Sequence, residues 1–283
     1  LSRRQRQMCI RDSGLCAVAC GVLLAAVSCK EKTVDGTGGT ERQEGIHYVK
    51  SVKSVCELFG AVSESKAVFR YDDAWRLSRI DVTDEDGSYA VGYAWEETKL
   101  TVTTDYGDGE SFRGTFSLDG SGRITELTIT GGEEAVRWKY TYENGAVVEY
   151  RSNLVTRVGG IVWDAGNIVS ADLLYAFEDP DDDEGDVWTE SLTCTYSPHA
   201  NTYSIDMNAL TCSYFNPLST VVPRFEGVSC AGLLSSFRCA ESSYGETEAA
   251  EISYETDTAG RIVRMTVNYG YGSSDRYAFT YYD

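Results

Sequence analysis

The chain has 283 residues and is strongly acidic, with 44 Asp and Glu against 25 Lys and Arg. Proteins bind nucleic acids mainly through clustered Lys and Arg, so this balance excludes a nucleic-acid partner. Aromatic residues make up 12% of the chain, with 19 Tyr, whereas disordered chains are poor in them. We therefore expect a folded domain whose excess of carboxylates keeps a secreted protein soluble.

The N-terminal segment carries an apolar run, LCAVACGVLLAAVS, from Leu15 to Ser28, directly before Cys29. The run is too short to span a bilayer but suits the core of a signal peptide. The residues around Cys29 resemble a bacterial lipobox. We therefore predict a signal peptide over residues 1–28 and lipidation at Cys29; the alternatives are an ordinary signal peptide or a buried helix. Residues 1–13 resemble a translated sequencing-adapter read-through.

The segment that follows is polar and rich in Gly and Thr, which predicts a flexible tether over residues 29–45 that carries the lipid. A single domain is expected over residues 46–283. Its opening stretch, Ser51 to Phe59, is amphipathic and fits either a helix or a strand.

From Phe69 onward, aromatic-rich segments with period-2 alternation are separated by turns rich in Asp, Asn and Gly. Trp138, Tyr140 and Tyr142, for example, share one face of such a segment, which indicates strands with one dry and one wet face. One spacing, apolar-x-x-apolar-x-apolar, recurs after the turns at Leu77/Ile80/Val82, Ile124/Leu127/Ile129, Ile168/Ala171/Leu173 and Ile262/Met265/Val267. A fixed spacing of this kind indicates a repeated β-hairpin.

The hairpins together predict an all-β fold, an antiparallel up-and-down meander of about 12–15 strands that is curled or barrel-like. Whether the sheet closes stays open at this point. The stretch at about 207–240 holds two of the four Pro and no hairpin signal, so we expect an irregular, partly helical insertion there.

Five cysteines follow Cys29, namely Cys56, Cys194, Cys212, Cys230 and Cys239. An odd number cannot all pair within one chain, and one or two disulfides are expected among the last four, with the pairing open. There is no C-x-x-C spacing after Cys29, and the two histidines, His47 and His199, are far apart. We therefore predict neither a structural metal nor a cofactor.

The acidic loop Asp179–Asp186 places carboxylates at alternate positions, with Glu190 twelfth when Asp179 is counted as first. This spacing resembles a calcium loop, but the glycine that such a loop needs arrives one residue late, at Gly185. We interpret the loop as a solvated hairpin tip, with a weak calcium contact as the alternative.

No spacing in the chain supports Cys–His catalysis, and no catalytic residues are predicted. Paired carboxylates for glycoside hydrolysis would have to meet in a cleft, which sequence does not reveal. Among the five Trp, Trp75 and Trp95 lie at hairpin ends and form a candidate platform for sugar rings or a protein partner. The alternative reading places them in the core.

Three features now stand together: the lipobox-like Cys29, hairpins of the form YD-x-x-G-R-I such as Tyr254–Val267, and Tyr203–Leu210 followed by an insertion. This combination resembles a family of Bacteroidota lipoproteins of unknown function whose β-rich domain is described as porin-like. The hairpins by themselves also resemble the YD repeats of large secreted toxins.

The resemblance implies a cell-envelope lipoprotein held at the outer membrane by its lipid, with no catalytic residues to carry over. Arg, Lys and Glu on the predicted strands do not suit a lipid-facing band, which argues against an integral porin. We predict a non-enzymatic scaffold that binds a glycan or an envelope protein. The alternatives are a carbohydrate-active enzyme and a passive structural component.

Overall fold

The computed structural model describes residues 42–106, 111–131, 135–153, 156–177, 186–212, 223–241, 247–269 and 272–283. Within these ranges the chain forms sixteen strands and one short 3-10 helix. The strands are β1 (Val49–Leu58), β2 (Ala61–Tyr71), β3 (Leu77–Asp84), β4 (Ser88–Glu96), β5 (Lys99–Asp105), β6 (Ser111–Leu118), β7 (Ile124–Thr130), β8 (Val136–Glu143), β9 (Ala146–Ser152), β10 (Arg157–Asp164), β11 (Asn167–Phe177), β12 (Asp186–Ala200), β13 (Gly232–Glu241), β14 (Thr247–Thr256), β15 (Ile262–Tyr269) and β16 (Ser274–Tyr281).

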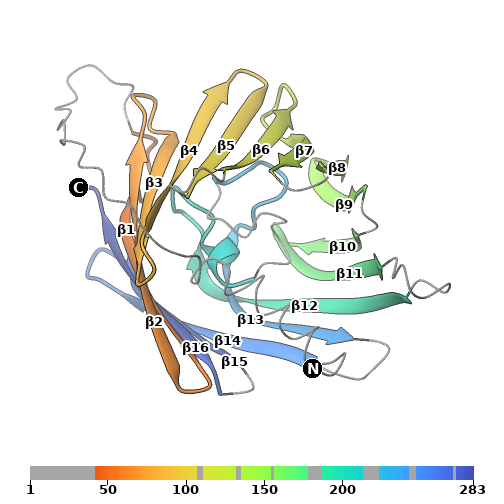
Figure 1. The fold of residues 1–283 in the computed structure, drawn as a ribbon. Helices are drawn as coiled ribbons and strands as arrows, with labels where there is room; N and C mark the ends of the chain where they lie inside the picture. The colour runs from red at the N-terminus through yellow and green to blue at the C-terminus, as the bar shows by residue number, and fades with distance from the viewer. Residues whose placement is uncertain are drawn as a thin grey trace.

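Each strand pairs antiparallel with the next in sequence, and β1 pairs with β16, so the sheet closes into a barrel (Figure 1). Val52 lies opposite Phe279 across the closing seam. The predicted antiparallel meander is confirmed, and Ser51–Phe59 belongs mainly to the first strand. Closure pairs the two edges that an open meander would leave exposed.

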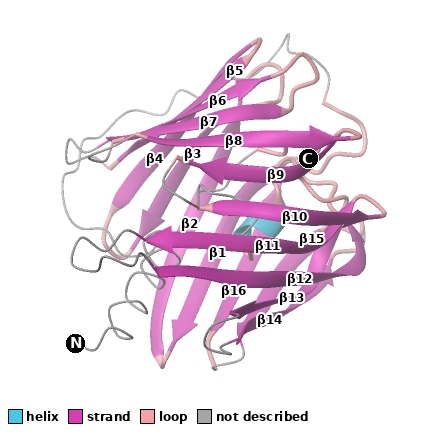
Figure 2. Cartoon of the chain, turned by 90° about the vertical axis from the view of Figure 1, so that its right-hand side faces the viewer, coloured by secondary structure: helices cyan, strands magenta, loops and turns pink. Residues whose placement is uncertain are grey.

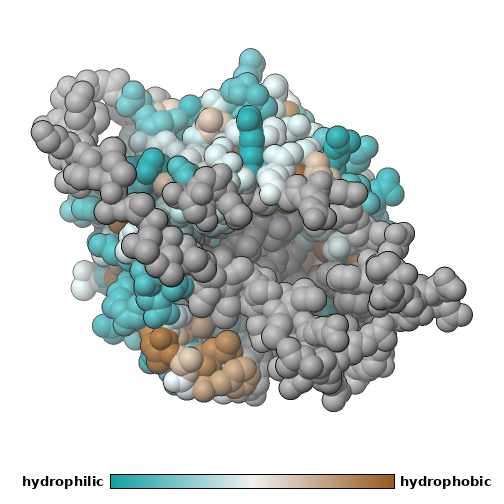
Figure 3. Space-filling view, viewed as in Figure 1, coloured by the Kyte–Doolittle hydropathy of each residue, from teal (hydrophilic) through white to brown (hydrophobic). Residues whose placement is uncertain are grey.

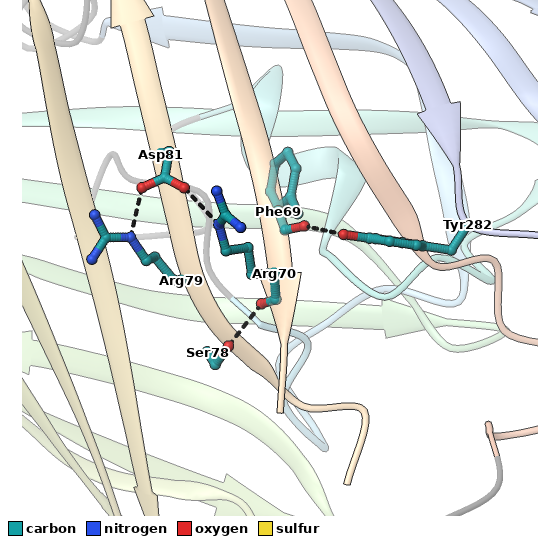
Figure 4. A network of polar contacts seen from close by, with 6 residues as sticks. All are labelled: Phe69, Arg70, Ser78, Arg79, Asp81 and Tyr282. Atoms are coloured by element: carbon teal, nitrogen blue, oxygen red, sulfur yellow. Dashed lines mark hydrogen bonds and ion pairs between the residues drawn. The ribbon is translucent and has the colours of Figure 1, made fainter. Parts of the chain in front are cut away.

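The interior of the barrel is apolar because alternate residues of each strand point inward. On β2 and β3, the buried Phe69 and Ile80 face each other across the strand pair. The residues that follow them in the chain point outward and are polar. Among these, Asp81 accepts hydrogen bonds from Arg70 Nε at 2.8 Å and from Arg79 Nε at 2.6 Å (Figure 4). The barrel wall is therefore dry inside and wet outside.

Ion pairs between neighbouring strands recur around the outer face. They include Lys53–Glu64, Arg157–Glu149, Arg264–Glu255 and Arg276–Glu57. A transmembrane barrel instead turns an apolar band about 25 Å tall toward lipid and keeps its polar residues inside. The described outer face has the opposite polarity. No helix within the described ranges is long and apolar enough to cross a membrane.

The described residues between β12 and β13 enter the barrel at one end of it, and we call them the plug. These residues, 201–212 and 223–231, include helix η1 (Met207–Leu210), which the ring of strands encloses in both views (Figures 1 and 2). Asp206 caps this helix by accepting a hydrogen bond from the Asn208 N–H. Ile205, Met207 and Cys230 are buried, so the plug completes the core.

The predicted insertion at about 207–240 differs from the structure at its C-terminal side, where Gly232–Glu241 forms strand β13. A bulge hides this strand from the sequence pattern. Thr195 pairs with Ser236 while the next residue pairs with Leu234, so Ser235 is the extra residue. The hydroxyls of Ser235 and Ser236 both lie 2.8 Å from Thr195 Oγ1, and the two preceding leucines are both buried. Strict alternation is therefore lost.

Candidate functional site

The plugged end of the barrel carries a turn that occurs three times with the same geometry. An Asp side chain accepts hydrogen bonds from two backbone N–H groups of its own turn, and its second oxygen pairs with an Arg four residues later. The three pairs are Asp72–Arg76, Asp119–Arg123 and Asp257–Arg261, at 2.7 to 2.8 Å. The Arg guanidinium lowers the pKa of Asp119 and of Asp257. Two of these turns, Asp119–Arg123 and Asp257–Arg261, have the D-x-x-G-R sequence, and Asp72–Arg76 has Trp75 in place of the glycine.

An aromatic side chain closes the inner side of most hairpins at this end. Each donates a hydrogen bond to the carbonyl of the first inward residue on the preceding strand. The donor–acceptor pairs are Tyr71–Val49, Trp95–Leu77, Trp163–Val147, Tyr196–Ile168, Tyr254–Leu234 and Tyr281–Ile262. We call these six aromatic residues the girdle.

The Arg of each turn also lies over an aromatic ring of the neighbouring hairpin. Arg76 is 5.8 Å from the Trp95 ring centre, and Arg261 is 5.2 Å from that of Tyr281. Arg123 lies 5.1 Å from the ring centre of Tyr142, which holds the corresponding place on β8. Cation–π contacts of this kind tie one hairpin to the next along the rim.

The plug binds to the strand residues whose carbonyls the girdle occupies. The N–H of Val49 donates to Ser204 Oγ at 3.0 Å, and that of Ile262 donates to Tyr203 Oη at 3.0 Å. Three further residues of the same kind complete the pattern, with N–H bonds from Val147 to Gly227 O, from Ile168 to Cys230 Sγ and from Leu234 to Asn208 Oδ1. At five strand ends, one residue therefore has a hydrogen-bond partner for both its N–H and its C=O. These partners come from the plug and the girdle, and not from the ladder of a neighbouring strand.

Trp75, one half of the predicted platform, sits at the third position after Asp72 in its turn. The other two turns have glycine there, Gly122 and Gly260, at φ of 78° and 79°, whereas Trp75 has a φ of 57°. A side chain in this left-handed region costs about 1 kcal/mol or more. The geometry of the turn therefore does not explain why a tryptophan occupies this position.

The Trp75 ring is half-buried in an aromatic cluster at the outer rim. Its centre lies 4.9 Å from that of Tyr48 and 6.3 Å from that of Tyr282, and the guanidinium of Arg42 stands 4.0 Å above it. Arg42 also donates a hydrogen bond to the main-chain oxygen of Asp283. We call Arg42, Tyr48, Tyr71, Trp75 and Tyr282 the rim cluster.

Trp95, the other half of the predicted platform, belongs to the girdle. Its indole N–H donates to Leu77 O at 2.8 Å, and its ring packs partly against the core beneath Arg76. Arg76 follows Trp75 directly in the chain, so Trp75 lies within this arginine turn and Trp95 lies beneath the arginine of the turn.

No disulfide joins any two of the five cysteines in the described part of the chain. Cys230 lies in the plug, with its sulfur 3.2 Å from Tyr196 Oη and 3.4 Å from the Ile168 nitrogen. Burial raises the pKa of the Cys194 thiol to about 12 and that of Cys230 to about 11. The one or two disulfides expected among Cys194, Cys212, Cys230 and Cys239 are therefore absent. The sulfurs of Cys230 and Cys239 instead bond to polar groups, those of Tyr196 and Glu190.

The groups considered for catalysis do not meet. His199 packs against the Tyr254 ring, and His47 packs against Tyr203 and Tyr281, with its pKa lowered by burial and by Arg261. Among the described residues, no three His, Cys, Asp or Glu side chains gather where they would hold a metal ion.

A shallow hollow of about 250 Å³ lies on the outer face of β12 to β15. It is lined by Thr195, Ser235, Ser236, Glu251, Ile252, Ser253 and Asn268. Glu251 is the one carboxylate among these lining residues, whereas glycoside hydrolysis in its usual form needs two.

The predicted calcium loop falls largely outside the described residues, which omit 178–185. Its twelfth position, Glu190, lies on β12, faces the barrel interior and is buried. Its carboxylate accepts a hydrogen bond from the Cys239 thiol at 3.1 Å.

The barrel is similar to solved structures of other proteins, although no match is found by sequence. No family model matches the chain, and no curated protein matches it. Among solved structures, a porin-like protein from Bacteroides vulgatus superposes with a TM-score of 0.54 at 16% identity, over 83% of this chain and 99% of that one. A porin-like protein from Bacteroides uniformis gives 0.52 at 11% identity, over 84% and 100%. The chain has the porin-like fold. At these identities the likeness concerns the fold alone.

Sequence reasoning missed most of the rim cluster and all of the contacts of the plug. Arg42, Tyr48 and Tyr282 come from the two ends of the described chain, and closure of the barrel brings them together beside Trp75. One signal was available: Trp75 stands where the sister turns carry glycine. The described residues of the plug, 201–212 and 223–231, show no sequence pattern that predicts a position inside a barrel.

Proposed function

We propose that this protein with the porin-like fold is a lipid-anchored component of the bacterial cell envelope that serves as a binding scaffold and not as a channel. One observation carries the proposal: the interior is filled with apolar side chains and the plug, while the outer strand faces carry ion pairs. A porin needs the reverse arrangement. The barrel is then a rigid body whose outer surface and rims are available for binding.

The anchor of this scaffold is the predicted lipid on Cys29. Metabolic labelling with palmitate in a Bacteroides host should give a labelled, membrane-associated protein, and Cys29→Ser should abolish the label. Cys20→Ser, in the same apolar run, is the matched control and should keep it. Equal labelling of Cys29→Ser and the parent would contradict the anchor.

The absence of conduction has its own test. The purified mature protein, added to planar lipid bilayers, should give no discrete conductance steps at concentrations where a known porin gives them. Stepwise conductance would overturn the proposal directly.

The proposed binding surface is the rim cluster together with Trp95 on the neighbouring hairpin, and the proposed ligand class is a glycan. A half-buried Trp held in a strained backbone conformation, beside Arg42 and two tyrosines, combines an aromatic ring with hydrogen-bond donors. Sugar rings bind to this combination through stacking and hydrogen bonds to hydroxyls. A protein partner is the alternative occupant.

The chain from Lys30 onward should be tested against a panel of polysaccharides and mucin glycans. Trp75→Ala and Trp95→Ala should lower the affinity by about tenfold or more. Trp163→Ala is the control for Trp95→Ala, because each indole donates to a backbone carbonyl of the preceding strand. Binding that survives both rim variants would place the site elsewhere, and no binding to any glycan would favour a protein partner or a passive structural role.

A further inference from the structure

The β1–β2 hairpin ends in an exposed apolar tip at the end of the barrel opposite the plug. The residues from Leu58 to Ser63 carry no charge, and Phe59 and Val62 are 69% and 55% exposed. The last pair between β1 and β16 is Glu57 with Ser274, and the last between β2 and β3 is Ser65 with Asp84. The ladders that join this hairpin to β16 and β3 therefore end before Leu58 and Val62, which pair only within the hairpin itself, and Figure 3 shows apolar residues gathered where Figure 1 draws the tip.

The residue at the apex is unfavourable for the turn that it forms. Phe59 and Gly60 are the two central residues of a tight turn, with φ of 50° and 84°. The β8–β9 hairpin has the same two angles at Asn144 and Gly145, the pair that such turns favour. Phenylalanine tolerates this conformation poorly, because a side chain with a Cβ is crowded when φ is positive. Strain of this kind points to a role outside the fold.

A second apolar group lies at the same end. Tyr106, which follows the last residue of β5, is 43% exposed and packs on Tyr89 with ring centres 5.6 Å apart. Three of the four large apolar side chains exposed in the described ranges thus lie at the far end; the fourth is Val162 on β10. Aromatic residues with a polar tip, such as Tyr106, favour the boundary between water and lipid.

We propose that the tip Leu58–Val62 inserts into the interfacial region of a bilayer, a role that rests on the proposed membrane anchor. Stable protein–protein interfaces bury about 1,200 Å² or more, which exceeds what a five-residue tip offers, whereas a bilayer requires only an uncharged apolar apex. The chain between Cys29 and Arg42 extends to roughly 40 Å, and the ten residues of β1 rise roughly 33 Å. The anchor therefore reaches the membrane that the tip touches.

The net negative charge of the protein affects which lipid headgroups the tip should favour. The formal net charge is −19, and Glu57, Glu64 and Asp84 lie around the tip, with the first two paired to Arg276 and Lys53. An anionic surface would repel this protein at low salt. Insertion should accordingly favour zwitterionic lipids such as phosphatidylethanolamine and phosphatidylcholine.

The test is vesicle flotation of the chain from Lys30 onward, which contains the whole closed barrel and lacks the predicted lipid. The parent protein should float with zwitterionic vesicles. Phe59→Asn should reduce binding about tenfold, the factor for burying one large apolar side chain. The same variant should melt at a higher temperature, because it restores an Asn-Gly turn. Val162→Asn, at the fourth exposed apolar position, should leave binding unchanged.

Several results would overturn the insertion. They are a parent protein that does not float, equal flotation of Phe59→Asn, equal loss in Val162→Asn, or binding to anionic vesicles alone. A lower melting temperature in Phe59→Asn would give Phe59 a structural role instead. A dimer of the parent that Phe59→Asn dissociates, seen by sedimentation in the absence of lipid, would identify a second copy as the occupant. Palmitate labelling of Phe59→Asn reports the anchor separately, so failure of insertion and failure of the proposed function are distinguishable.

Discussion

The side-chain amide of Asn208 bonds to the backbone of the first residues of β13, inside the barrel. Its Oδ1 accepts the N–H of Leu234 at 2.9 Å, and its Nδ2 donates to the carbonyl of Gly232 at 2.9 Å. Asn208 is 2% exposed and lies in helix η1 of the plug. One side chain therefore supplies the backbone of a strand with the bonds that its bulge removes.

Replacement of Asn208 by Ala should destabilise the protein by about 2–4 kcal/mol, because two buried backbone groups lose their partners. Chemical unfolding monitored by circular dichroism measures the change. Asn153→Ala is the matched control: Asn153 makes two side-chain bonds to the backbone, to Arg137 N and Ala135 O, but is exposed. That variant should lose less than about 1 kcal/mol. Equal losses in the two variants would contradict the role of the plug.

The arginine turns should give the protein an acid-sensitive rim. Hydrogen bonds from Arg123 and Arg261 lower the pKa of Asp119 and Asp257 in the folded state. Such groups contribute stability above the unfolded value, about pH 4, and the contribution is lost as the pH falls through the folded pKa. We expect the melting temperature to fall below about pH 4, and to fall less in the Asp119→Asn/Asp257→Asn variant. An unchanged acid profile in that variant would argue against the turns as its source.

Ionisation of the tyrosines should destabilise the fold at alkaline pH. Burial raises the pKa of Tyr89 to about 12, and it raises the pKa of Tyr71, Tyr93, Tyr140 and Tyr254 further. A folded state that favours the neutral phenol contributes stability below the unfolded value near 10, and this stability is lost as the pH rises above it. Ultraviolet titration should show phenolate formation coupled to unfolding above about pH 10. In guanidinium chloride the tyrosines should titrate near 10, and early titration of the native protein would contradict their burial.

The thiols of Cys194 and Cys230 should be unreactive in the native protein. Both are buried, and their raised pKa values leave little thiolate at neutral pH. Alkylation followed by mass spectrometry should therefore label them only after unfolding. Cys56, which is partly exposed, is the internal comparison and should react faster. Native labelling of Cys230 at the unfolded rate would show that the plug opens readily.

The local structure of this protein could be predicted from its residues alone. Apolar spacing from Leu77 to Val82 and from Ile262 to Val267, with Asp- and Gly-rich turns between strands, sufficed to predict hairpins and an antiparallel meander. These features depend on residues close in the chain, such as the carboxylate of Asp257 and the guanidinium of Arg261. Period-2 alternation likewise separates a dry face from a wet one without knowledge of the partner strand.

That the dry faces meet inside a closed barrel became known only from the fold of the whole chain. Closure depends on the pairing of β1 with β16, whose residues Val52 and Phe279 are 227 positions apart, and no local pattern encodes such a pair. The bulge at Ser235 concealed β13, because it breaks the alternation by which strands are recognised. The position of the plug could not be predicted either. The Ile262 N–H that donates to the Tyr203 hydroxyl is a backbone group that every non-proline residue carries. Local sterics and polarity depend on each residue and its neighbours in the chain, so they can be predicted from sequence. Hydrogen bonds to buried backbone groups form only when segments far apart in the chain come together.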